Sequence, residues 1–264
     1  MNFPGALTAA VQDHPYPLLF ATISGAHLYG FPSPDSDWDL RGVHLLPARE
    51  VLGLMGGQET VQLMNDPRLE HLQMAPYSTE IELDLVTHDA SKFFRLMLKR
   101  NGYVLEQLHS PLVVHTSPAH AELRTLAARC VTRHHAHHYL GFSANQWRLF
   151  AGESPPRVKP LLYTFRTLLT GLHLMKTGEI QANLGVLNEE ARLPYLDELM
   201  AQKRSGAEKE PFRGDAAFFE QEFQRLTRQL EEARDASHLP GEVGGETTRA
   251  LSNLLVTLRL KDLT

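Results

Sequence analysis

Short apolar segments and one strict alternation predict a sheet in the first third of the chain. Residues 18–23 (LLFATI) form an apolar run that is typical of a buried strand. Residues 37–46 (DWDLRGVHLL) predict a second strand, and residues 80–86 (EIELDLV) alternate polar and apolar positions with the period of a half-buried strand. Residues 51–79 indicate loops with weak strand content.

Helical patterns follow the last of these strands. Asp89 is a suitable N-cap for a helix over residues 90–100, which ends in basic residues followed by Asn and Gly. Two more helices are predicted near residues 103–108 and 118–129.

From about residue 131 the periodicity is almost wholly helical. The predicted helices cover residues 131–150, 160–177, 215–236 and 246–260. Pro160 suits a first helical position and Gly178 a C-terminal cap. The sequence therefore predicts an α+β fold, with a mixed first domain over residues 1–130 and an all-helical second domain over residues 131–264.

Composition narrows the class of protein. The 264 residues are 42% hydrophobic and 22% charged, as in an ordinary globular protein. Cys130 is the single cysteine, which excludes an intramolecular disulfide. The formal net charge of −5 argues against broad electrostatic wrapping of nucleic acid but leaves room for a small basic groove. Because we find neither a secretory signal nor a run of roughly 18 apolar residues, we expect a cytoplasmic protein without membrane contact.

Two carboxylates carry the strongest chemical signal. Asp37 and Asp39 are separated by one residue, so on a strand both side chains point to one face, while Trp38 and Leu40 point toward a core. Aligned carboxylates on a rigid strand can hold hard divalent cations. Two such cations can activate an attacking hydroxyl and stabilise a leaving pyrophosphate.

The neighbouring segments predict the rest of a phosphoryl-transfer site. Gly25 follows the first strand, and its missing side chain lets phosphate oxygens approach the backbone closely. A third carboxylate from the later strand would complete the metal site. Glu80, Glu82 and Asp84 share one face of that strand; we favour Asp84, with Glu82 as the main competitor.

These residues resemble a known family. SGAHLYGFPSPDSDWDLRGVHL, followed by ELDLVTHDASKFFRLMLKRNGYVLEQL, resembles the polymerase-β nucleotidyltransferase superfamily and, within it, the bacterial and phage family associated with RNA-repair ligases. The resemblance is clear over residues 18–108 and weaker over the helical half. It implies a polymerase-β-like catalytic core in residues 1–130 and a helical domain that binds nucleotide or acceptor.

The resemblance also implies roles for individual residues. Asp37 and Asp39 would bind two Mg²⁺ ions, for which Mn²⁺ can substitute. Asp84 would be the third ligand and would help to deprotonate the acceptor hydroxyl. The implied partners are a nucleoside triphosphate, an RNA acceptor, and an RNA ligase or kinase of the same pathway.

The nucleotide site shows one departure from the family pattern. Ala26 stands where the family usually has serine, which removes a hydroxyl expected to contact phosphate; Ser24 or backbone N–H groups are the alternatives. In the helical half, Lys159, Tyr163 and Arg166 match positions where such proteins contact phosphate or base. An arginine fork suits a phosphate.

Other interpretations of these residues stay open. The segment FPSPDSD is rich in turn residues, so an isolated Asp-x-Asp there would more often be a solvated turn. His134 and His138 are spaced as a chelating pair, but RNA or phosphate contact is the more natural function for that histidine cluster. Lys92 occupies the first turn of its helix, where a cation is disfavoured, which makes it a further functional candidate.

The sequence also leaves alternative functions open. The acceptor could be a protein hydroxyl or a small molecule, since a fold alone does not choose it. Ala26 motivates a catalytically weak nucleotide- or RNA-binding module. A metal-dependent nuclease or phosphatase is disfavoured, because hydrolysis needs no triphosphate cradle.

Overall fold

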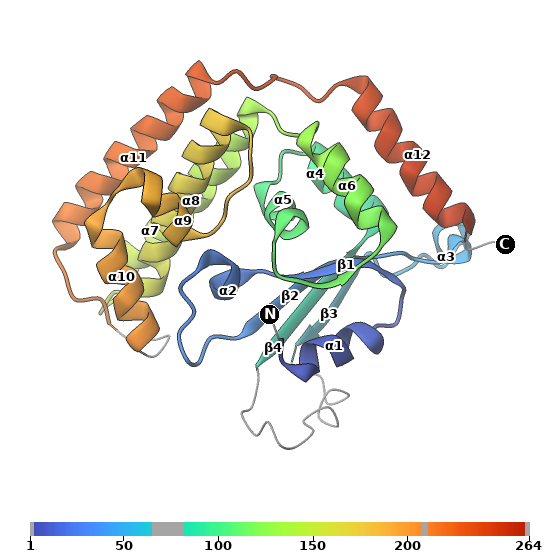
Figure 1. The fold of residues 1–264 in the computed structure, drawn as a ribbon, viewed down its shortest axis with the longest axis horizontal. Helices are drawn as coiled ribbons and strands as arrows, with labels where there is room; N and C mark the ends of the chain where they lie inside the picture. Colours follow the sequence, from blue (N-terminus) through green and yellow to red (C-terminus); the bar gives the residue numbers. More distant parts are fainter. Residues whose placement is uncertain (1–2, 65–81, 207–210, 262–264) are drawn as a thin grey trace.

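A computed structural model describes residues 3–64, 82–206 and 211–261. In these residues the strands form one five-stranded sheet of order β3-β4-β2-β1-β5. Figure 1 shows the sheet with helices on either side of it. The strands are β1 (Leu18–Ile23), β2 (Trp38–His44), β3 (Thr60–Met64), β4 (Leu83–Asp89) and β5 (Val113–Thr116). Strands β2 and β4 pair in parallel, and the other pairs are antiparallel. The mixed sheet confirms the predicted α+β class.

The bounds of β2 and β4 differ from the predicted ranges, residues 37–46 and 80–86. The alternating strand runs from Leu83 to Asp89, with every odd position buried, so it continues beyond residue 86. Glu80 lies outside the described residues, and Glu82 is exposed just before the strand begins. The weak strand content predicted between residues 51 and 79 corresponds to β3.

Helices cover both faces of the sheet. The first half contains α1 (Gly5–Gln12), α2 (Gly25–Tyr29), α3 (Ala48–Leu52), α4 (Ala90–Leu98), α5 (Gly102–His109) and α6 (Pro118–Ala128). On one face, Leu7 of α1 joins Ile23, Leu40 and Leu85 in a small apolar cluster, against which Trp38 packs. Helices α4, α5 and α6 lie over the other face. The predicted inward direction of Trp38 and Leu40 is therefore confirmed.

The second half is helical, as predicted. Its elements are η2 (Arg133–His135), α7 (Ala136–Gly152), α8 (Val158–Thr177), α9 (Leu184–Ala191), α10 (Pro194–Ser205), α11 (Ala216–Ala236) and α12 (Gly245–Lys261). The cap at Gly178 is confirmed, with φ 79°. Pro160 is the third residue of α8 rather than its first, because the helix already begins at Val158. The sequence did not predict α9 and α10.

A single large apolar cluster runs through both halves, from Leu19 in β1 to Leu254 in α12. Helix α12 packs on α4 and α6 (Figure 1). Its Arg259 donates to both carboxylate oxygens of Asp89, at 2.7 and 2.5 Å, and to the carbonyl of Leu46. The division at residue 130 stays a prediction, and it crosses this shared core. Within the described residues, no helix has the length and apolar character needed to span a membrane.

Candidate active site

The parallel pairing of β2 and β4 brings two carboxylates together. Asp39 and Asp84 are direct register partners in this pair. Because directly paired residues of neighbouring strands point to the same face, the two side chains lie side by side. Asp37 lies just before β2, which begins at Trp38, so it belongs to the incoming loop rather than to the strand itself. The sequence placed Asp37 on the strand, and the structure moves it to the strand entrance.

The turn after β1 lies against Asp39. Gly25 has a φ of 60°, in the left-handed region, and a Cβ built on it would stand 1.8 Å from Oδ2 of Asp39. The backbone N–H of Ser24 donates to the carbonyl oxygen of Asp39 at 2.8 Å, which anchors the turn to β2. The turn and the carboxylate, 14 positions apart in sequence, therefore touch.

Neither side chain beside Gly25 opens onto the surface. Ser24 is fully buried, and its Oγ has no hydrogen-bond partner among the described residues. Ala26 is 5% exposed and belongs to the large apolar cluster. Their predicted nucleotide contacts stay predictions.

Several charged side chains surround Asp39 and shift its pKa. The surroundings of Asp39 together raise its pKa to about 6. Burial is the largest cause, Arg41 opposes it, the charges of Asp37 and Asp84 add to it, and Lys159 acts to lower the pKa. A carboxyl with a raised pKa in a group of three is poised to exchange its proton for a cation.

Sequence reasoning missed Arg41. Its Nη2 donates to Oδ1 of Asp39 at 2.6 Å and to Oδ2 of Asp84 at 2.7 Å, so the guanidinium lies between the two carboxylates. A signal was available: Arg41 is two residues beyond Asp39 on the same strand, and therefore on the same face.

Helix α8 contributes two of its three predicted residues to this region. Lys159 and Tyr163 are close enough for charge interaction with Asp39, and the Lys159 Nζ stands 6.0 Å from the centroid of the Tyr163 ring. Arg166 behaves differently. It is 3% exposed, its Nη1 donates to Oε1 of Glu106 at 2.7 Å, and its Cζ lies 3.9 Å from the centroid of the Tyr29 ring. Arg166 is therefore buried in the core, where it is paired with Glu106. Contact between Arg166 and nucleotide stays a prediction.

Comparison with known proteins identifies the family. A model of the RNA repair pathway DNA polymerase beta family matches residues 3–257. The chain belongs to this family. An uncharacterized protein of Methanocaldococcus jannaschii is 28% identical over 195 residues, covering 70% of this chain and 74% of the relative. The uncharacterized protein YcgL of Bacillus subtilis is 26% identical over 255 residues, covering 92% of this chain and 91% of the relative.

One solved structure is also similar. It is a nucleotidyltransferase-like protein from Exiguobacterium sibiricum, with 11% identity, a TM-score of 0.32, and coverage of 97% of this chain and 79% of the other. At that score the similarity carries no argument, and family membership rests on the sequence match.

The residues of this family member suit a hard divalent cation. Asp37, Asp39 and Asp84 supply carboxylate oxygens, the ligands that Mg²⁺ and Mn²⁺ prefer. Oδ1 of Asp84 is buried without a hydrogen-bond partner among the described residues, so its lone pairs are not used by those residues. In the described residues, no three His, Cys, Asp or Glu side chains already stand around a common point. Arg41, held between two of the carboxylates, supplies the positive charge in this arrangement.

The other candidates lie elsewhere. His135 is buried and pairs with Thr132, while the rings of His134 and His137 stack 5.8 Å apart. Lys92 donates to the Thr60 hydroxyl at 2.5 Å, on the edge strand β3. These contacts give His135 and Lys92 structural partners; phosphate or RNA contact by the histidine cluster stays a prediction.

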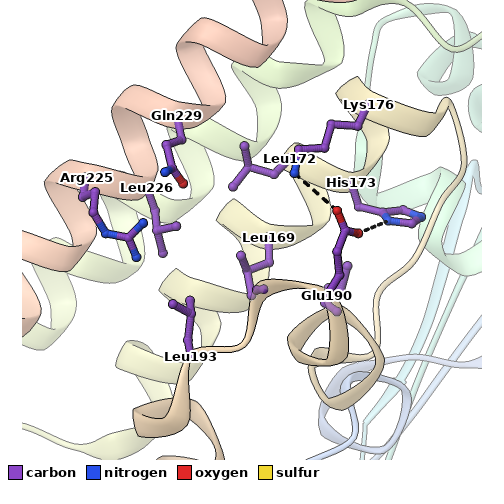
Figure 2. Close-up of a pocket in the computed structure, with 11 residues that line it drawn as sticks. Leu169, Leu172, His173, Lys176, Glu190, Leu193, Arg225, Leu226 and Gln229 are labelled. Atoms are coloured by element: carbon purple, nitrogen blue, oxygen red, sulfur yellow. Dashed lines mark hydrogen bonds and ion pairs between the residues drawn. The ribbon is translucent and has the colours of Figure 1, made fainter.

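A separate cavity of about 230 Å³ opens between α8, α9 and α11 (Figure 2). Its apolar wall consists of Leu169, Leu172, Leu187, Ala191, Leu193 and Leu226. At its edge, Glu190 lies 3.3 Å from the Lys176 Nζ and 3.6 Å from the His173 Nδ1. Its lining includes none of Asp37, Asp39 and Asp84, so it is distinct from the acidic site.

Proposed function

We propose that this protein is a metal-dependent nucleotidyltransferase, which moves a nucleoside monophosphate from a nucleoside triphosphate to a hydroxyl group and releases pyrophosphate. One observation carries the proposal: Asp39 and Asp84 are paired across β2 and β4, and the Gly25 turn closes on Asp39. Membership of a polymerase-beta family supports the same chemistry. Such a reaction needs metal ligands and a backbone that phosphates can approach. Asp39 and Asp84 would meet the first requirement and Gly25 the second.

In the proposed reaction, the acceptor oxygen bonds to the α-phosphorus while the bond from that phosphorus to the leaving pyrophosphate oxygen breaks. The hydroxyl proton passes to the carboxylate of Asp84. Asp37, Asp39 and Asp84 would hold two Mg²⁺ or Mn²⁺ ions, which activate the attacking oxygen and stabilise charge on the pyrophosphate. Lys159 would pair with the triphosphate, because its ammonium already acts on the charge of Asp39.

We propose an RNA end as the acceptor. The name of the family refers to RNA repair, and a net charge of −5 suits a short or structured RNA end better than a long duplex. An RNA ligase or kinase would then act on the same RNA before or after this protein. A protein or small-molecule acceptor and a weak binding module remain as outcomes of the test.

The test is incubation with Mg²⁺, each α-labelled nucleoside triphosphate in turn, and a pool of small RNAs. Wild type is compared with Asp37→Ala/Asp39→Ala and with Glu59→Ala. Glu59 makes an exposed ion pair with Arg95, so its loss controls for removal of a carboxylate elsewhere.

Label in RNA from wild type and Glu59→Ala, but not from the double variant, supports the proposal and names the donor. Label on protein alone moves the acceptor to a protein hydroxyl. Nucleotide binding without transfer to any acceptor favours the binding module, which Ala26 motivates.

A further inference from the structure

Every N–H group of the Arg41 guanidinium donates a hydrogen bond within or beside the acidic site. Its Nη2 donates to the carboxylates of Asp39 and Asp84. Its Nη1 donates to the carbonyl oxygens of Asp84 at 2.6 Å and of Leu40 at 3.1 Å, and its Nε donates to the Tyr103 hydroxyl at 3.0 Å. These contacts use all five N–H groups of an arginine. Arg41 is 8% exposed, so its position is set by the protein rather than by solvent.

The two carboxylates each give Arg41 one oxygen and keep the other. Asp39 uses Oδ1, and its Oδ2 lies against the Gly25 turn. Asp84 uses Oδ2, while its Oδ1 is buried with no hydrogen-bond partner among the described residues. An unsatisfied buried oxygen is costly, so its presence at a paired carboxylate points to a ligand that binds there.

We infer that Arg41 is a positioning residue, which holds one oxygen of each carboxylate so that the other stays directed at the divalent metal. This inference rests on the proposed function. Two adjacent carboxylates repel each other, and a rigid cationic fork between them fixes both their separation and their rotation. Tyr103 of α5 also holds the guanidinium in place, because its hydroxyl accepts a hydrogen bond from Nε of Arg41.

A lysine at this position would keep the charge but lose the fork. Its ammonium is a point charge on a flexible stem, and it cannot reproduce five directed hydrogen bonds. Changes to groups that orient metal ligands typically weaken metal binding by about 10- to 100-fold. A residue that serves only the fold would change stability and leave the metal affinity unchanged.

The experiment measures Mn²⁺ binding to the full-length protein without nucleotide, by electron paramagnetic resonance of the free and bound ion. Arg41→Lys is expected to bind Mn²⁺ about 10- to 100-fold more weakly than wild type. Tyr103→Phe keeps the charge and both carboxylate contacts, and is expected to weaken binding by about threefold to tenfold. Arg95→Lys is the matched control at a surface pair and should bind as wild type does.

Chemical rescue separates positioning from folding. Sub-denaturing guanidinium should restore Mn²⁺ binding to Arg41→Ala, because the free ion can occupy the vacated position between the carboxylates. Mn²⁺ binding by Arg41→Lys within twofold of wild type, or tighter than wild type, would overturn the inference; tighter binding would mean that Arg41 competes with the metal. If circular dichroism shows that the Arg41 variants do not fold, an unchanged affinity in Tyr103→Phe overturns it instead.

Failure of the proposed function has a different signature. Asp39→Asn/Asp84→Asn should abolish Mn²⁺ binding whatever Arg41 does. Equal Mn²⁺ binding by wild type and this double variant would place the metal elsewhere and defeat the proposed site. Loss of binding in the carboxylate variant together with full binding in Arg41→Lys would leave the site standing and remove only the role of Arg41.

Discussion

The Cα of Gly25 lies against the carboxylate of Asp39, so closely that a Cβ on residue 25 would stand 1.8 Å from Oδ2. This contact joins the turn after β1 to the acidic strand β2. Because of this contact, the proposed phosphate-binding turn and the proposed metal ligand cannot move independently. Any side chain at residue 25 must displace that carboxylate.

Gly25→Ala should therefore reduce nucleotidyl transfer by about 100-fold or more, because a small displacement of a metal ligand is enough for such a loss. The left-handed backbone adds strain of roughly 1–2 kcal/mol to the folded state. Gly56→Ala is the matched control, since Gly56 has a φ of 64° but no atom within 4 Å of its Cβ position. Both rates and unfolding free energies should be measured. Equal activity losses in the two variants would mean that strain, and not the Asp39 contact, matters.

Asp84 and Glu82 can be separated by substitution. Asp84 is in register with Asp39, whereas Glu82 is exposed and precedes β4. Asp84→Ala should lower the rate by about 10³-fold or more, because a metal ligand contributes several kcal/mol to transition-state stabilisation. Glu82→Ala should stay within a few-fold of wild type. The reverse ranking in a single-turnover assay would transfer the third ligand to Glu82.

We expect Arg166 to contribute to the stability of the fold. It is buried with Glu106, whose other oxygen accepts from the Tyr29 hydroxyl at 3.1 Å. Arg166→Met leaves a buried carboxylate unpaired and should lower the free energy of unfolding by about 3–5 kcal/mol. Arg166→Met/Glu106→Gln should recover part of that loss. Urea denaturation checks this; unchanged stability with weakened nucleotide binding would instead support direct contact with nucleotide.

Acid should destabilise the protein through buried neutral histidines. Burial, and then the neighbouring His14, lower the pKa of His44 to about 4. The unfolded chain takes up this proton near pH 6.5, and the folded chain only near pH 4, so stability falls as the pH drops across this range. The contribution of His44 is at most about 3 kcal/mol.

His109 and His135 act in the same direction, since burial lowers the pKa of each to about 4. Urea unfolding at pH 7 and pH 4.5 should show the loss, and His44→Asn should show a shallower dependence on pH. A free energy of unfolding that stays constant between these two pH values would contradict the assignment of neutral, buried histidines.

Local patterns determined much of this fold. The run at residues 18–23 and the alternation around Asp84 predicted strands, because side chains of a strand alternate between faces over a few residues. Asp89 and Gly178 marked helix ends, because capping groups satisfy backbone atoms within one turn. The spacing of Asp37 and Asp39, with Gly25 before them, also predicted the components of the site.

Only the tertiary structure decided how these components meet. The parallel register of β2 and β4 pairs Asp39 with Asp84, 45 positions later, and leaves Glu82 outside the strand. That register depends on burying Leu40 and Leu85 in one cluster, since a slip of one residue would turn the apolar face outward. The ion pairs of Arg41 with Asp84 and of Arg166 with Glu106 join distant segments, 43 and 60 positions apart, and local sequence rules extend over only a few residues.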